Sequence, residues 1–98
     1  MATVINRLRL TGDRDEFERL LGSMTTFMKG RPGFVSHRLY RSARNPDVYV
    51  ELAEWRDASD HRQAMQSPEF QAHIPRLMKH AEAEPDVFEA VEEGTADH

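Results

Sequence analysis

Two strand-like segments of this chain carry side chains that could act together on a small molecule. In the segment 48–55, Glu51 and Trp55 fall on one face, because successive side chains of a strand point to opposite sides. Asn6 lies on the apolar face of the segment 4–10. A positioned carboxyl can act as a general base, an amide can donate and accept hydrogen bonds, and an indole offers a flat apolar wall. The combination suggests a site for a small molecule.

Each of these residues also has a purely structural interpretation. A tryptophan at the end of a strand often belongs to the core, because it brings a large apolar surface. Asn6 could find its hydrogen-bond partners in backbone groups alone. Glu51 could instead form an ion pair with an arginine such as Arg38, and structural ion pairs also perturb carboxylates. The sequence leaves both sets of interpretations open.

Other familiar catalytic patterns are missing from the sequence. The histidines show neither an H-x-H nor an H-E-x-x-H pattern, so no metal site is expected; they are His37, His61, His73, His80 and His98. His37 is expected at the surface and His61 on a solvated helix face. There is no cysteine, which excludes disulfides and thiolate chemistry. The chain has no glycine-rich phosphate loop and no nucleophile elbow.

Local signals divide the chain into alternating strands and helices. Asp13 and Glu16 form a capping-box pattern that begins an amphipathic helix, and Gly30 ends it. Ser67 and Pro68 begin another helix, since serine caps helix ends and proline favours the first turn. The sequence predicts strands over 4–10, 34–41, 48–55 and 87–91, and helices over 14–29, 58–65 and from 68 onward, the last kinked at Pro75 and the region closed by Pro85.

The predicted order is β-α-β-β-α-β, which is the ferredoxin-like arrangement of the α+β class. It places one antiparallel sheet under helices that cover a single face. Residues 1–98 are expected to form one domain, with 92–98 as a frayed tail. If Trp55 points toward the helices, then Val48, Val50 and Leu52 project from the uncovered face. Exposed apolar surface on a small domain usually meets a partner, so a homodimer through this face is expected.

Composition narrows the class of protein. The chain has 98 residues and a net charge of −4 with no basic stripe, which argues against nucleic-acid binding. No apolar run approaches the roughly 20 residues of a membrane span, and no secretion signal is expected at the N-terminus. Together with the lack of cysteine, these features predict a cytoplasmic protein with no membrane partner.

Three segments of the chain resemble the antibiotic biosynthesis monooxygenase family of dimeric α/β-barrel proteins. They are RPGFVSHRLYRS, PDVYVELAEWRD and HRQAMQSPEFQAH, within a resemblance that runs from Asn6 to about Val91. The sequence is most similar to the small cofactor-free oxygenases of aromatic polyketide pathways. In those proteins an Asn of the first strand, and an Asn and a Trp of the third, surround the substrate. Asn6 and Trp55 match, whereas Glu51 replaces the second Asn.

The resemblance implies a cofactor-independent monooxygenase that uses O2 to oxidise an anthrone-like aromatic polyketide intermediate to a quinone. Glu51 is then the expected general base, Asn6 orients a carbonyl or hydroxyl, and Trp55 forms a flat wall. The residues expected to contact the substrate are Phe17, Met24, Phe27 and Leu77 as apolar lining, and Arg38, Tyr40 and Tyr49 as polar contacts.

Three alternative functions remain open at this stage. A polyketide cyclase could use Glu51 as its base in the same cavity. Haem degradation is disfavoured, because that branch of the family places its axial histidine four residues after the position of Phe70, whereas His73 follows by three. A ligand-binding homodimer without catalysis would bind a polyketide but would not turn it over.

Overall fold

The computed structural model describes residues 1–97, so His98 and its expected place in the tail lie outside the described residues. The chain forms β1 (Ala2–Leu10), α1 (Arg14–Lys29), β2 (Phe34–Arg41), β3 (Val48–Trp55), α2 (Ala58–Met65), α3 (Pro68–Leu77) and β4 (Ala81–Phe88). The predicted ferredoxin-like order is confirmed, with its second helical region divided into α2 and α3. Residues 89–97 form neither helix nor strand.

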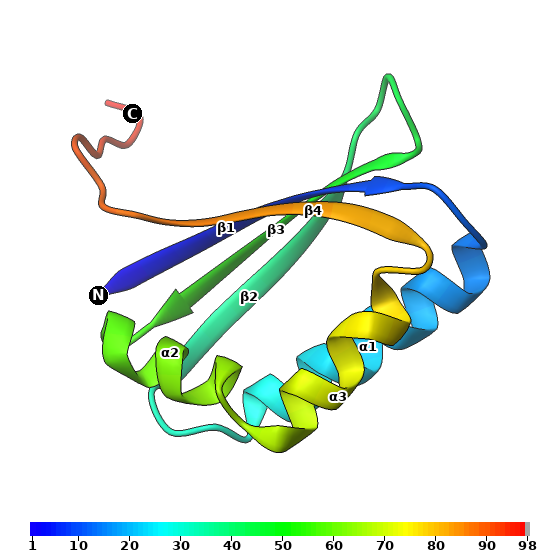
Figure 1. Ribbon diagram of the computed structural model, residues 1–98. Coiled ribbons are helices and arrows are strands. Elements are labelled where there is room, and N and C mark those ends of the chain that lie inside the picture. The colour runs from blue at the N-terminus through cyan, green and yellow to red at the C-terminus, as the bar shows by residue number, and fades with distance from the viewer. Residues whose placement is uncertain (98) are drawn as a thin grey trace.

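The four strands make one sheet in the order β2-β3-β1-β4, and every neighbouring pair is antiparallel. Figure 1 shows all three helices on one side of this sheet, with α1 and α3 side by side and α2 near the end of β3. No element of residues 1–97 covers the other side. The sheet therefore has an inner face toward the helices and an open face.

Side-chain caps fix where the helices begin. The Asp13 carboxylate accepts from the backbone N–H of Glu16 at 2.8 Å, and Asp57 and Ser67 cap α2 and α3 in the same way. The reciprocal half of the expected capping box is absent, because Glu16 pairs with Arg19 instead. The backbone N–H of Asp13 donates to Nδ1 of His80 at 3.2 Å, which joins the start of α1 to the start of β4.

The expected position of the last strand was wrong. β4 begins at Ala81 and ends at Phe88, whereas the sequence predicted 87–91. Pro85, interpreted as a terminator, lies inside the strand. A proline is tolerated there because β4 is an edge strand that pairs only with β1, so the lost N–H removes no essential bond. The alternation of alanine with glutamate over 81–84 is the signal that identifies the strand.

The core under the sheet consists of two clusters. The larger contains Leu8, Phe17, Leu20, Leu21, Tyr49, Leu77 and Ala81, and the smaller contains Ala2, Val4, Trp55 and Ala64. Leu8 and Val4 are two of the inward residues of β1, as the alternation of that strand predicts. Because the two clusters lie at different ends of the sheet and do not merge, the space between them remains open to a ligand.

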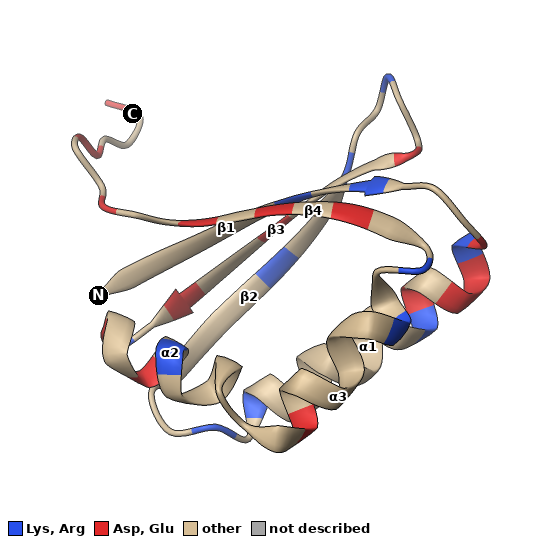
Figure 2. Cartoon of the chain, viewed as in Figure 1, with Lys and Arg blue, Asp and Glu red and all other residues tan. Residues whose placement is uncertain are grey.

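Charged residues lie mainly on the outside. Figure 2 shows acidic residues along β4 next to the basic residues of β1. Arg9 and Glu82 are 2.6 Å apart and Arg7 and Glu84 are 4.0 Å apart, both pairs on the open face. Such exposed pairs contribute roughly 0–1 kcal/mol each. No helix within the described part of the chain is long and apolar enough to cross a membrane.

Candidate active site

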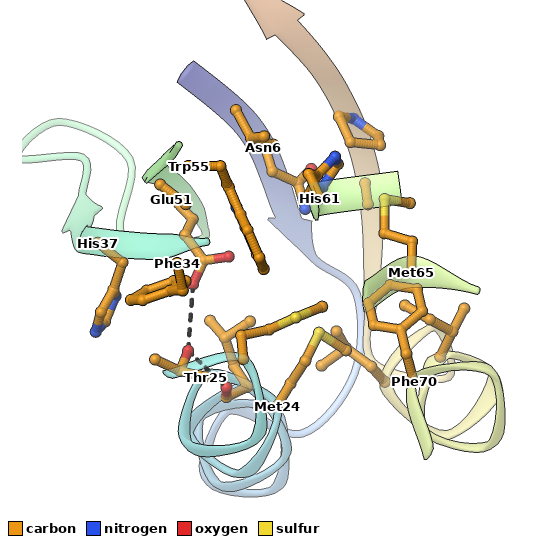
Figure 3. Close-up of a pocket in the computed structure, with 18 of the residues that line it drawn as sticks. Asn6, Met24, Thr25, Phe34, His37, Glu51, Trp55, His61, Met65 and Phe70 are labelled. Atoms are coloured by element: carbon orange, nitrogen blue, oxygen red, sulfur yellow. Dashed lines mark hydrogen bonds between the residues drawn. The ribbon is translucent and has the colours of Figure 1, made fainter. Parts of the chain in front are cut away.

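A cavity of about 370 Å³ lies between the inner face of the sheet and the helices. This volume is within the range of small-molecule sites. The lining is largely apolar and includes the four methionines Met24, Met28, Met65 and Met78. Its polar side chains are few: Asn6, Thr25, His37, Glu51, His61 and Gln71. Figure 3 shows Asn6 and Glu51 from the sheet, Thr25 from α1 and His61 from α2 around one space.

Asn6 and Glu51 are direct neighbours across the β1–β3 ladder. Directly opposed side chains on one face of an antiparallel pair have Cβ atoms about 4.5–5.5 Å apart. The Oδ1 atom of Asn6 is buried and has no hydrogen-bond partner within residues 1–97. A buried polar atom without a partner costs free energy, so this oxygen is available to a donor supplied by a ligand.

The Glu51 carboxyl lies deep in the cavity wall, and burial raises its pKa above the usual 4.5 while the Thr25 hydroxyl opposes that shift. Oγ1 of Thr25 is 3.4 Å from Oε2 of Glu51 and 3.1 Å from the carbonyl oxygen of Leu21. A hydroxyl has one proton to donate, and the closer acceptor is Leu21. The ionised carboxylate is therefore weakly compensated, which makes Glu51 a good proton acceptor.

Trp55 forms one wall of the cavity and also belongs to the smaller core cluster, with 1% of its surface exposed. The Phe34 ring meets the indole edge to face, with centroids 5.2 Å apart and an interplanar angle of 87°. The His61 ring also contacts the indole, with ring centroids 5.5 Å apart and an interplanar angle of 61°. These two contacts hold the indole in place, and little of its surface is left exposed to the cavity.

A tight loop before β2 positions Phe34 against Trp55. Gly33 has a φ of +85°, and a Cβ at this position would collide with the buried carboxylate of Asp60. Nε and Nη2 of the Arg56 side chain each donate to the Asp60 carboxylate at 3.1 Å. The backbone N–H of Arg56 donates to the carbonyl oxygen of Gly33 at 2.7 Å. The glycine of the Arg-Pro-Gly-Phe sequence thus allows the loop to lie against α2.

The structure places five of the expected site residues around the cavity: Asn6, Met24, Glu51, Trp55 and Leu77. It does not bring Phe17 and Tyr49 there, because both are packed in the larger core cluster. The Tyr49 hydroxyl donates to Glu18 at 2.6 Å and accepts from Arg14 at 2.7 Å, which occupies it with a structural network. Phe27 faces a separate small hollow between α1 and α3.

Arg38 and Tyr40 lie on the open face of the sheet, away from the cavity. Their cross-strand partners are Leu52 and Val50, and directly paired residues point to the same side. The expected substrate contacts of Arg38 and Tyr40 are therefore not made from this chain. For the same reason Arg38 does not form the ion pair with Glu51 that the sequence left open.

Sequence reasoning missed two histidines of the cavity. A β-bulge between Phe34 and Ser36 adds one residue to β2, so Phe34 and His37 share the inner face although they are three positions apart. His61 lies on the inner face of α2 together with the buried Ala64. The two residues are three positions apart, and residues at this separation lie on the same side of a helix. Burial lowers the pKa of both imidazoles below 6.5, helped by Lys29 for His37 and by Arg62 for His61.

His73 lies outside the cavity, and its Nε2 is 2.9 Å from the carbonyl oxygen of Leu20. Within residues 1–97 no group of three or more His, Cys, Asp or Glu side chains could hold a metal ion. The cavity therefore offers acid–base and hydrogen-bonding groups on apolar walls.

Comparison with known proteins identifies relatives with the same fold. Residues 1–76 match the family described as antibiotic biosynthesis monooxygenase. A protein of Streptomyces nogalater named deoxynogalonate monooxygenase is 33% identical over 88 residues, which covers 90% of this chain and 75% of that protein. The crystal structure of SnoaB, described as a cofactor-independent oxygenase from Streptomyces nogalater, superposes with a TM-score of 0.89, 32% identity and 94% coverage of both chains.

A more distant structure extends the agreement in fold. HapK from Hahella chejuensis superposes over 100% of both chains with a TM-score of 0.77 and 23% identity. At that level of identity the similarity concerns the fold alone. The match of the family model over most of the chain, with the close relative, shows that this protein belongs to the antibiotic biosynthesis monooxygenase family.

Proposed function

We propose that this protein is a cofactor-independent monooxygenase that oxidises an anthrone-like aromatic polyketide intermediate to a quinone, with O2 as co-substrate. The observation that carries the proposal is the unpaired Oδ1 of Asn6 beside the buried carboxyl of Glu51 in an apolar cavity. The relatives support it, since one is named deoxynogalonate monooxygenase and another is described as a cofactor-independent oxygenase.

An anthrone carries an acidic methylene group between two aromatic rings. Removal of one proton leaves a carbanion that is delocalised onto the carbonyl oxygen and can react with O2 directly. The overall reaction replaces two hydrogens by one oxygen: the methylene compound and O2 give the ketone and water. Such a reaction requires a base, a polar group that orients the substrate oxygen, and a cavity that excludes water.

The proposed roles follow from where the side chains lie. Glu51 accepts the methylene proton and becomes neutral, so it does not repel the substrate anion that forms. Asn6 accepts a hydrogen bond from a phenolic hydroxyl of the substrate through its unpaired Oδ1. Trp55 supplies a flat wall, while Met24 and Leu77 provide apolar lining. No lysine or arginine lines the cavity within the described chain, which favours a neutral aromatic substrate.

The test is O2 uptake by protein treated with a chelator, using dithranol as a model anthrone and subtracting the uncatalysed rate. We expect uptake with quinone formation, and one atom of labelled O2 in the new carbonyl. Glu51→Gln should lower the rate by roughly 10²–10⁴-fold, because positioned proton transfer contributes about that much. Asn6→Ala should raise KM, because it removes a hydrogen-bond partner of the substrate. The control Gln63→Ala removes an exposed amide from the outer side of α2 and should change neither the rate nor KM.

Trp55 is best tested by Trp55→Phe. Complete truncation to alanine would remove a buried core residue at a cost of about 3–5 kcal/mol and would confuse loss of activity with loss of folding. Chelator-resistant uptake that disappears in Glu51→Gln supports the proposal. Product formation that continues at the same rate without O2 would favour the cyclase instead, and binding of dithranol without turnover would favour a ligand-binding protein.

A further inference from the structure

Oxidation of a methylene group to a ketone removes two protons from one carbon, and Glu51 accounts only for the first. The two hydrogens of such a carbon in a flat ring system point to opposite faces of the rings. Loss of the first proton makes this carbon planar, and addition of O2 on the Glu51 side then turns the remaining hydrogen toward the opposite face. If the proposed function holds and O2 adds on that side, the second proton needs an acceptor on a different wall of the cavity.

Only three titratable side chains line the cavity among residues 1–97: His37, Glu51 and His61. His61 projects from α2 and contacts the indole of Trp55 at 5.5 Å. Figure 3 shows the His61 ring on the side of Asn6 and Met65, while the Glu51 carboxyl lies on the side of Thr25. The two groups therefore line the cavity from different walls, Glu51 from β3 and His61 from α2.

The environment of His61 suits a proton acceptor. Figure 3 marks no hydrogen bond between the His61 ring and the other residues drawn around the cavity, so a nitrogen lone pair is free for a ligand. Burial, and to a lesser extent the charge of Arg62, lower its pKa below 6.5. The imidazole is consequently neutral near pH 7, which is the form that accepts a proton.

His37 also lines the cavity, and its Nδ1 atom is buried without a hydrogen-bond partner, but it is less well placed for this role. Its ring lies 6.3 Å from that of Phe34, and Phe34 in turn contacts Trp55 at 5.2 Å. In Figure 3 the Phe34 ring stands between His37 and the indole. A substrate stacked against Trp55 is therefore separated from His37 by an aromatic side chain.

We propose that His61 is a further catalytic residue, which removes the second substrate proton in the step that breaks the O–O bond. Glu51 takes the first proton, the carbanion forms a C–O bond with O2, and the resulting peroxide anion takes that proton back. Neutral His61 then removes the remaining C–H proton, whose bonding electrons form the ketone C=O as the O–O bond breaks. The departing hydroxide takes the proton from His61 and leaves as water.

This sequence of steps is balanced and returns both side chains to their starting states. It also divides the chemistry between two residues that can be tested separately. Loss of Glu51 should prevent O2 uptake, whereas loss of His61 should allow uptake and stop the reaction at the substrate hydroperoxide. The two readouts distinguish a failure of the proposed function from a failure of the role given to His61.

The experiment follows O2 uptake, quinone formation and the substrate-plus-O2 adduct by mass spectrometry, for wild type, His61→Phe and His61→Gly with dithranol. We expect the adduct to accumulate in both variants and quinone formation to fall at least about tenfold. A positioned proton-transfer group typically contributes roughly 10²–10⁴-fold in rate, so a tenfold loss is a conservative threshold. Added imidazole should restore quinone formation in His61→Gly. The control Gln63→Ala, also on α2, should behave as wild type.

A measurement on the wild-type protein does not depend on the folding of a variant. As the pH falls through the pKa of His61, the ratio of adduct to quinone should rise, since imidazolium cannot accept a proton. His37, Glu51 and Arg62 are the other titratable groups near His61, and protonation of Glu51 slows uptake rather than changing this ratio.

Wild type that takes up no O2 overturns the proposed function and this role together. Uptake by wild type with normal quinone formation in the His61 variants, or a proportional loss of uptake and quinone without adduct, overturns the role of His61 alone.

Discussion

At the scale of single residues, Glu51 is the side chain whose charge state most affects both stability and chemistry. Its pKa is raised by burial, so the folded state holds the proton more tightly than the unfolded chain does. The stabilising effect of that proton is complete below the unfolded value of 4.5 and is lost as the pH rises through the folded pKa. Above it, the buried carboxylate destabilises the fold.

Replacing the carboxyl by an amide should remove this cost. We expect Glu51→Gln to unfold at a higher urea concentration than wild type above neutral pH, with a difference that shrinks on acidification. Each unit by which the pKa is raised corresponds to about 1.4 kcal/mol. Urea titrations of both proteins across the pH range provide the measurement, and a difference that grows toward acid pH would contradict it.

The positions of Asn6, Glu51 and Trp55 follow from the alternation of two regular strands, which is why the sequence predicts them. His37 escapes the same reasoning because the bulge after Phe34 changes the parity of β2. Arg38 and Tyr40 fall on the open face as a result. No local pattern in the sequence reveals a bulge of this kind, since it depends on pairing with β3.

At the scale of elements, the loop between α1 and β2 depends on one glycine. Gly33→Ala should cost about 1–3 kcal/mol for the positive φ, in addition to the collision with Asp60. Gly22→Ala is the matched control, because it lies inside α1 with no atom near its would-be Cβ and should stabilise the protein by up to about 1 kcal/mol. Thermal unfolding followed by circular dichroism compares the two, and equal effects would refute the role of the loop.

The helices were predicted more accurately than the last strand, for a physical reason. Helix ends depend on capping residues adjacent in sequence, such as Asp13, Asp57 and Ser67. β4 depends instead on pairing with β1, far away in the chain. Pro85 is acceptable only because that pairing leaves one edge of β4 free, and an edge position cannot be recognised before the strand order is known.

At the scale of the whole molecule, the open face of the sheet remains to be covered. Its register brings together Tyr40, Val50 and Leu52, with Ile5 beside them on β1. We propose that a second copy of the chain packs on this face. Val50→Glu would place a charge at its centre and should convert a homodimer into monomers at micromolar concentration. Light scattering after size-exclusion chromatography measures this, with Gln63→Glu as a control that adds the same charge on α2. Wild type that is monomeric under these conditions would exclude the homodimer.

The bulge in β2 has a consequence for how this protein can change over generations. One additional residue between Phe34 and Ser36 allows the strand to present His37 inward and Arg38 outward. Deleting Val35, the residue that the bulge adds, would leave every later pairing in place, so His37 would still lie opposite Ala53 and Arg38 opposite Leu52. The strand would become regular, and no side chain beyond it would exchange sides. Chain length can therefore vary by one residue at this point over generations while the chemistry of both faces is kept.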